Sequence, residues 1–259
     1  MSEEHITRNF DNCKILSTVF SINAVSVTGE RNKREKNRNQ DSYVGSFIKN
    51  GALLAVADGL GSCKNSDLGS KLAIDCINDW VINDLPKYIC PSDEMIAVLN
   101  NKIIDKWKDK IAPEDFKDYD TTLLYVIVVN EHLIAGGIGD GMILCSFNGE
   151  VIEFSWNKNE FSNRTLSIGS RYAKDLMRGE LINIKDIHFP LTIILTTDGI
   201  AEDLDPKVKN TLPKYLYDML RETNTSTLQN DIEDWVINWN TQNHSDDRTF
   251  CMLNIYKEE

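Results

Sequence analysis

The chain has 259 residues, of which 41% are hydrophobic, and a formal net charge of −12 at pH 7 with a pI near 4.8. This charge argues against nucleic-acid binding, which needs Lys and Arg to neutralise phosphates, and it has the wrong sign for attraction to anionic lipid. No apolar stretch approaches the roughly 20 residues of a membrane-spanning helix, and the first ten residues lack the basic and apolar regions of a secretion signal. We therefore expect a soluble, cytoplasmic protein that binds neither nucleic acid nor membrane.

Nothing in the sequence divides the chain into parts. No Pro-, Ser- or Gly-rich linker, low-complexity tract or repeat separates the first apolar run, near Leu16, from the last, near Tyr256. We expect one domain over residues 1–259, with its core over about 17–256. The six cysteines form no CxxC pair and only four histidines are present, so free thiols are expected and a zinc site is not.

The apolar pattern over the first part of the chain predicts strands followed by two helices. β-Branched and apolar residues indicate strands over 17–28, 41–47 and 52–57, the first of them as a strand or an entry hairpin. Apolar residues at helical spacing then predict a helix over 66–83 and a second that begins near residue 91 and includes Trp107.

The second part of the chain returns to strands. The expected strands cover 121–129, 133–138, 142–147, 151–156, 193–197 and 248–256, and the expected helices lie near 203–221 and 227–240. Residues 157–188 are polar and irregular, and we expect them to form a mobile segment over the functional site. Because most strands follow one another as hairpins, the pattern favours an α+β fold of antiparallel sheets with helices packed outside.

Short Asp-bearing turns adjoin four of the apolar runs. Asp58, Asp140 and Asp198 each follow such a run and precede a glycine, and the pair Asp246-Asp247 precedes the last run. A single Asp-Gly is usually a structural turn. A carboxylate at the end of a buried strand is nevertheless costly unless a cation neutralises it. Together, these turns indicate one shared site for a cation with oxygen ligands.

A family resemblance rests on five short motifs in register. They are Asn39-Gln40-Asp41, Asp58-Gly59-Leu60-Gly61, Gly139-Asp140, Thr197-Asp198-Gly199 and Asp246-Asp247-Arg248-Thr249. In order and spacing they resemble the metal-dependent, type 2C Ser/Thr protein phosphatases of the bacterial type, over nearly the whole chain. The resemblance implies a four-layer α-β-β-α sandwich of two antiparallel sheets flanked by helices.

The resemblance also implies a centre of two Mn²⁺ or Mg²⁺ ions, with a third and weaker ion in bacterial-type members. Asp58 would bridge the two ions, with the carbonyl of Gly59 on one of them and Asp198 and Asp246 on the other. Asp41 would hold metal-bound water, either as a ligand or from one step further away. Asp140, together with Asp198, would bind the third ion.

The activity implied is hydrolysis of phosphoserine and phosphothreonine in proteins, with a metal-activated water attacking phosphorus directly and Asp58, Asp198 and Asp41 in catalytic roles. The sequence departs from the family at three places. Lys36 stands where the family has a phosphate-binding Arg, so Lys36, Arg34 or Arg38 is expected to contact phosphate.

The second departure is the segment after Asp58-Gly59, which lacks the His proposed as a general acid in many relatives. Metal-bound water or solvent would then protonate the leaving group. The third is Asp247, which stands where the family usually has Asn. Asp246 is the expected ligand, although an exchange of roles between Asp246 and Asp247 stays open.

The expected partners are phosphorylated protein substrates and a cognate Ser/Thr kinase, in a signalling protein that is a monomer. Two alternatives to the phosphatase follow from the same residues. One is a catalytically weak pseudophosphatase that binds phosphoproteins as a regulatory module, suggested by Lys36 and the missing His. The other is a hydrolase of small phosphoesters. The physiological substrate cannot be inferred from the sequence.

Overall fold

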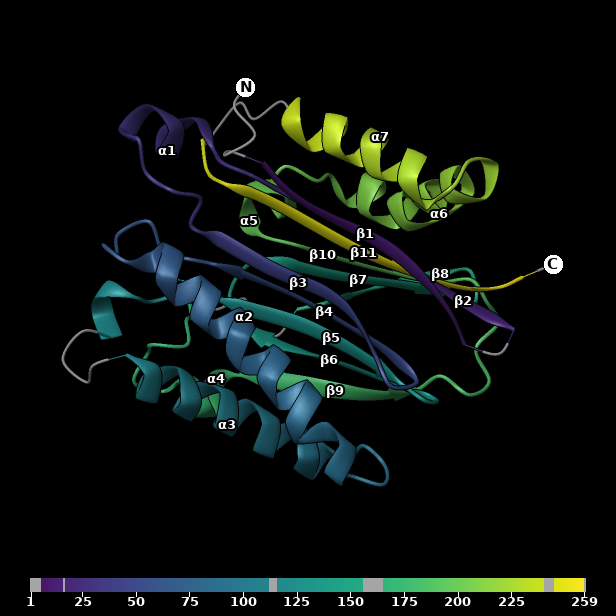
Figure 1. Cartoon of the computed structure of the whole chain (residues 1–259), viewed down its shortest axis with the longest axis horizontal. Coiled ribbons are helices and arrows are strands. Elements are labelled where there is room, and N and C mark those ends of the chain that lie inside the picture. The colour runs from purple at the N-terminus through teal and green to yellow at the C-terminus, as the bar shows by residue number, and fades with distance from the viewer. Residues whose placement is uncertain (1–5, 16, 112–115, 156–164, 240–244, 259) are drawn as a thin grey trace.

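The computed structural model describes residues 6–15, 17–111, 116–155, 165–239 and 245–258. Two antiparallel sheets lie face to face, and a layer of helices covers the outer face of each (Figure 1). The predicted α+β class and the four-layer arrangement are thereby confirmed. None of the helices in the described part of the chain combines the length and the apolar character that a membrane crossing requires.

The first sheet has six strands in the order β1-β2-β11-β10-β7-β8. In that order they span Ile6–Ile15, Thr18–Val27, Arg248–Lys257, Leu191–Thr196, Met142–Phe147 and Glu150–Phe154. The second sheet has five strands in the order β3-β4-β5-β6-β9. These span Asp41–Ile48, Gly51–Asp58, Leu123–Val129, His132–Ile138 and Arg178–Asn183.

Two long helices cover each sheet. The helices α2 (Ser66–Asn83) and α3 (Asp93–Lys110) pack on the second sheet, and α6 (Pro206–Glu222) and α7 (Thr225–Ile237) pack on the first. The remaining helical segments among the described residues are short: α1 (Glu30–Glu35), α4 (Ala173–Leu176), α5 (Asp198–Ala201) and two 3₁₀ turns at Leu85–Lys87 and Phe116–Asp118.

Three apolar clusters hold the four layers together. Between the sheets, Ile22, Leu54 and Leu253 are almost completely buried; Trp80 fills the interface under α2 and α3, and Phe250 the one under α6 and α7. The central strands are therefore covered on both faces. This double coverage explains why β4 and β5 are almost continuously apolar instead of alternating.

The structure differs from the sequence prediction in three regions, one of which is α1, where no helix was expected. The strand β1, which pairs with β2 along its whole length, was not expected, because it is an exposed edge strand of mostly polar residues with no apolar alternation. Residues 157–188 are not irregular throughout, since they contain α4 and the edge strand β9. Residues 157–164 of that segment lie outside the described part of the chain.

Candidate metal centre

Several predicted carboxylates meet at one end of the sandwich. Asp58 is the last residue of β4 and pairs directly with Asp41, the first residue of β3. Asp198 begins α5 just after β10, and Asp140 lies in the turn between β6 and β7. One carboxylate oxygen from each of Asp58, Asp140 and Asp198 lies within 4.8 Å of the other two. The topology thus joins three strand ends that are far apart in the sequence.

The electrostatics of this cluster suit a cation. Burial, followed by the charges of Asp41, Asp198 and Asp140, raises the pKa of Asp58 well above its usual value. Burial, followed by Asp140 and Asp246, raises the pKa of Asp198 to about 7. Carboxylates repel one another in this way when no positive charge lies between them. Divalent cations such as Mg²⁺ and Mn²⁺ prefer oxygen ligands, so the donor set fits the ions that the sequence predicts.

Asp41 lies next to Asp58 and links the two sheets. Its Oδ2 accepts hydrogen bonds from Thr197 Oγ1 at 2.8 Å and Thr249 Oγ1 at 2.7 Å. Thr249 lies on β11 of the first sheet and Thr197 directly follows β10 of the same sheet, whereas Asp41 belongs to the second. Thr249 Oγ1 also lies 2.7 Å from Ser26 Oγ on β2. Burial raises the pKa of Asp41 well above its usual value, and the charge of Asp247 adds to the effect. Asp41 is therefore adjacent to Asp58 but is not part of the pocket wall.

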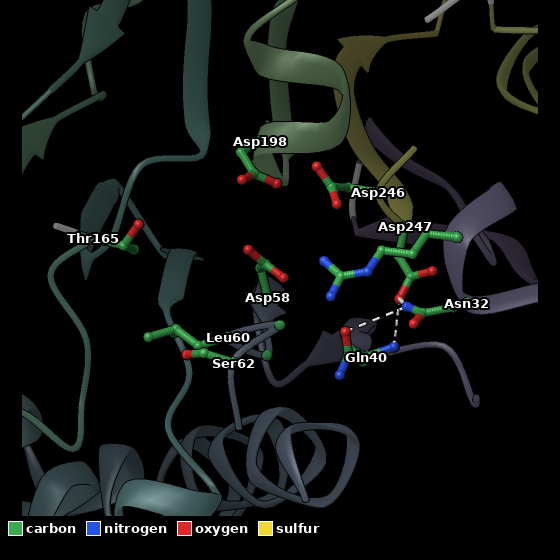
Figure 2. A pocket seen from close by; sticks show the side chains of 12 residues that line it. Asn32, Gln40, Asp58, Leu60, Ser62, Thr165, Asp198, Asp246 and Asp247 are labelled. Atoms are coloured by element: carbon green, nitrogen blue, oxygen red, sulfur yellow. Dashed lines mark hydrogen bonds between the residues drawn. The ribbon is translucent and has the colours of Figure 1, made fainter. Parts of the chain in front are cut away.

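Asp246 and Asp247 are neighbours with different surroundings. Asp247 Oδ1 accepts the backbone N–H of Gly29 at 2.6 Å, while its Oδ2 accepts that of Gln40 at 2.6 Å and Asn32 Nδ2 at 2.9 Å. Figure 2 shows Asp246 facing the same central space as Asp58 and Asp198, whereas Asp247 is directed toward Asn32 and Gln40. The protein's own donors therefore occupy Asp247.

The backbone of Asp246 and Asp247 passes between two glycines. A Cβ at Gly29 would lie 2.3 Å from the carbonyl carbon of Asp246, and a Cβ at Gly199 would lie 2.0 Å from the carbonyl oxygen of Asp247. Real Cβ atoms do not approach backbone this closely. Any larger residue at either position would therefore displace the segment that carries Asp246.

The basic segment after β2 reaches the pocket through a residue that the sequence did not single out. Arg31 and Asn32 of α1 line the cavity of about 350 Å³ that contains Asp58, Asp198 and Asp246. The candidates Arg34, Lys36 and Arg38 are exposed and are not among its described lining residues. The spacing before the Asn39-Gln40-Asp41 motif points to Lys36 and not to Arg31. The sequence could not identify Arg31, because it did not predict that residues 30–35 form a helix.

The opposite wall is held by Asp120, a further buried carboxylate that the sequence did not single out. Asp120 Oδ1 accepts the backbone N–H of Gly169 at 2.7 Å, and its Oδ2 accepts Ser167 Oγ at 2.7 Å. These bonds fix the segment from which Thr165 Oγ1 donates to Asp140 Oδ2 at 2.8 Å. No recognisable motif surrounds Asp120 or Thr165, which explains why neither was found.

The remaining wall comes from the segment after Asp58. Gly59, Leu60, Gly61 and Ser62 line the cavity, and the described lining residues include no histidine. Cys63 Sγ lies 2.9 Å from the carbonyl oxygen of Lys117, its hydrogen-bond acceptor. The departure seen in the sequence thus has a structural counterpart: no imidazole among these residues is available as a proton donor.

Comparison with known proteins gives consistent results. A family model described as protein phosphatase 2C matches residues 28–237. The crystal structure of a bacterial serine phosphatase has a TM-score of 0.67 and 14% identity, covering 92% of this chain and 98% of that chain. A search of curated protein sequences gives no significant match.

Two further structures were solved with metal ions. The catalytic domain of the serine/threonine protein phosphatase PstP, in complex with two manganese ions, has a TM-score of 0.62 and 15% identity, over 93% of this chain and all of that chain (100%). RsbX, in complex with magnesium, has a TM-score of 0.59 and 14% identity, over 95% of this chain and 100% of that chain. At these identities the likeness concerns the fold.

Proposed function

The chain belongs to the protein phosphatase 2C family, and from that premise we propose that it is a Mg²⁺- or Mn²⁺-dependent phosphatase of phosphoserine and phosphothreonine in proteins. The observation that carries the proposal is the approach of Asp58, Asp140 and Asp198 oxygens to within 4.8 Å of one another. The raised pKa of Asp58 and Asp198 supports it, because a cation would offset the burial and the carboxylate repulsion that raise both.

In the proposed centre Asp58, the Gly59 carbonyl, Asp198 and Asp246 would hold two cations. Asp140 and Asp198 would hold a third. When bound, the cations would lower the pKa of a coordinated water and offset negative charge on the phosphoryl oxygens. Asp41, held by two threonine hydroxyls, fixes the orientation of the carboxylate pair that it forms with Asp58.

Arg31 is the best-placed basic group for the substrate phosphate. It lines the same cavity as the acidic cluster, and its guanidinium can bind two phosphoryl oxygens at once. Since no histidine lines the described cavity, we propose that water protonates the departing seryl or threonyl oxygen. The rate should then depend strongly on the leaving group, and aryl phosphates should react faster than alkyl phosphates.

The test is hydrolysis of p-nitrophenyl phosphate and of a phosphothreonine peptide by the purified protein, with Mn²⁺, with Mg²⁺ and with EDTA. We expect activity only with metal, and its loss in Asp198→Asn. Isothermal titration calorimetry should give at least two Mn²⁺ per chain. Activity that persists in EDTA, or in the Asp198→Asn variant, would contradict the metal mechanism.

The same assays separate the alternatives. Phosphopeptide binding without turnover would identify a pseudophosphatase, and a strong preference for nucleotides or sugar phosphates over phosphopeptides would identify a small-phosphoester hydrolase. We further propose a monomer in the cytoplasm that opposes a Ser/Thr kinase. Light scattering tests whether the protein is a monomer. Phosphoproteomics of cells lacking the protein tests whether it opposes a kinase. Unchanged Ser/Thr phosphorylation would contradict it.

A further inference from the structure

The segment around α1 is strongly basic in a strongly acidic protein. Residues 30–38 contain five Lys or Arg and two Glu, a local charge of +3, while the whole chain has a formal charge of −12. The basic side chains are Arg31, Lys33, Arg34, Lys36 and Arg38. This contrast makes the segment a place where an anionic partner is attracted to a surface that otherwise repels it.

The segment is fixed at the edge of the pocket. Asp247 holds Gly29, Asn32 and Gln40, which lie before, within and after the basic run. The backbone N–H of Arg31 also donates to the carbonyl of Ser245 at 3.2 Å. Arg31 and Asn32 form part of the cavity wall, and the rest of α1 continues from this wall along the chain.

Three of the basic side chains are accessible to a binding partner. Arg34, Lys36 and Arg38 are exposed, and Arg38 makes only a solvent-screened contact of 3.6 Å with Asp67. Within the described part of the chain, Lys36 forms no ion pair. The structure therefore leaves most of this positive charge open to the surroundings.

The backbone of Lys36 supports the same conclusion. Lys36 ends α1 in the left-handed conformation with φ of 59°, where glycine or asparagine is normally found. The three other non-glycine residues with positive φ among those described are asparagines: Asn50, Asn130 and Asn148. Because asparagine or glycine would adopt this conformation at lower cost, we take the lysine at this position as a sign that its side chain has a role of its own.

We propose that Arg34, Lys36 and Arg38 form a docking surface for acidic residues that flank the phosphorylated residue of the substrate, an inference that rests on the proposed phosphatase function. Arg31 inside the pocket takes the phosphate, and the three exposed residues bind Asp and Glu side chains of the same peptide. The preferred substrates are then acidic phosphopeptides, selected by charge next to the reacting group.

The experiment compares the wild type with the triple variant Arg34→Glu/Lys36→Glu/Arg38→Glu. The matched control is Lys49→Glu/Lys185→Glu/Lys214→Glu, which makes the same change in net charge with exposed residues at the opposite end of the sandwich. The substrates are fluorescein-labelled phosphothreonine peptides flanked by Asp/Glu, by Ala or by Lys, together with p-nitrophenyl phosphate.

We expect the wild type to prefer the acidic peptide, and the α1 variant to lose about tenfold in kcat/KM for that peptide. Its p-nitrophenyl phosphate activity should stay within about twofold, as should both activities of the control variant. Raising the NaCl concentration should narrow the difference between peptides, because exposed charges are screened by salt.

Each other outcome is decisive. An equal loss on p-nitrophenyl phosphate would place these residues on the phosphate itself and overturn the docking proposal. Equal kcat/KM for all wild-type peptides would overturn it while leaving the phosphatase function intact. If no substrate is turned over, the proposed function fails, and fluorescence anisotropy with the labelled peptides still tests docking. Equal affinity of wild type and α1 variant for the acidic peptide would then reject it.

Discussion

The pocket and the framework beneath it both contain buried aspartates, but the two regions treat their charge differently. In the pocket, oxygens of Asp58, Asp140 and Asp198 approach one another, and burial together with the neighbouring carboxylates raises the pKa of Asp58 and of Asp198. In the framework, Asp247 and Asp120 accept hydrogen bonds from N–H and O–H groups of distant segments. The partner of a buried carboxylate, and not its burial, therefore decides whether it serves as a ligand or as a structural support.

The largest expected effect is on catalysis, from the pocket side of this comparison. Asp58→Asn should lower Mn²⁺-dependent hydrolysis of p-nitrophenyl phosphate by about 10³-fold or more, because a bridging ligand positions both ions and each contributes several kcal/mol to the transition state. The folded structure should persist, since Asn removes charge repulsion. Initial rates and circular dichroism check both points, and rates above one tenth of wild type would remove Asp58 from the centre.

For the aspartates that support the pocket through hydrogen bonds, we expect a loss of stability instead of a loss of catalysis. Asp247→Ala leaves two backbone N–H groups and Asn32 without their acceptor, and should lower the free energy of unfolding by about 3 kcal/mol. Urea denaturation measures this. The matched variant Asp246→Ala should lower stability less than Asp247→Ala does but weaken Mn²⁺ binding. The reverse result would exchange the roles of the two residues.

The stability of the metal-free protein should depend on pH through Asp198. Because the pKa of Asp198 rises from 3.8 to about 7 on folding, its stabilising contribution is complete below the unfolded value and is lost as the pH rises toward 7. In EDTA at pH 8, Asp198→Asn should therefore be more stable than wild type by about 2 kcal/mol, with a smaller difference at pH 5. Thermal unfolding at both pH values checks this. A variant less stable than wild type at pH 8 would show that Asp198 is not a repelled carboxylate.

The smallest expected effect lies where the two regions meet. Thr165→Val removes the hydrogen bond to Asp140 Oδ2 and should cost about 1 kcal/mol, which corresponds to a roughly fivefold weaker Mn²⁺ activation at the third site. A titration of activity against Mn²⁺ measures this shift. Unchanged activation would mean that Asp140 needs no support from the 165–169 segment.

The sequence predicted best what depends on apolar runs and on residues that end them. The hairpin strands, the four long helices and Asp58, Asp140 and Asp198 were visible because buried strands and the turns after them have a strong local pattern. The edge strand β1 has no such pattern, and its pairing depends on the partner strand β2.

The roles within the pocket were harder to predict because they depend on contacts between distant segments. The difference between Asp246 and Asp247 is decided by Gly29, Asn32 and Gln40, which lie more than 200 positions away in the chain. The place of Arg31 depends on α1, a six-residue helix too short for a periodic signal. Asp120 acts on residues 167 and 169, a pairing that no motif records.

The pairing of β3 with β4 restricts the length of the turn that connects them. The two strands pair without a bulge from Ile48 and Gly51, at the turn, to Asp41 and Asp58, about 24 Å away. A register shift by one residue would turn every side chain of one strand to the opposite face and separate the two aspartates. The tight connection at Lys49 and Asn50 thus sets the alignment of the carboxylates at the far end. In such a hairpin, a surface turn that touches no substrate becomes intolerant of insertion, although surface turns usually accept it.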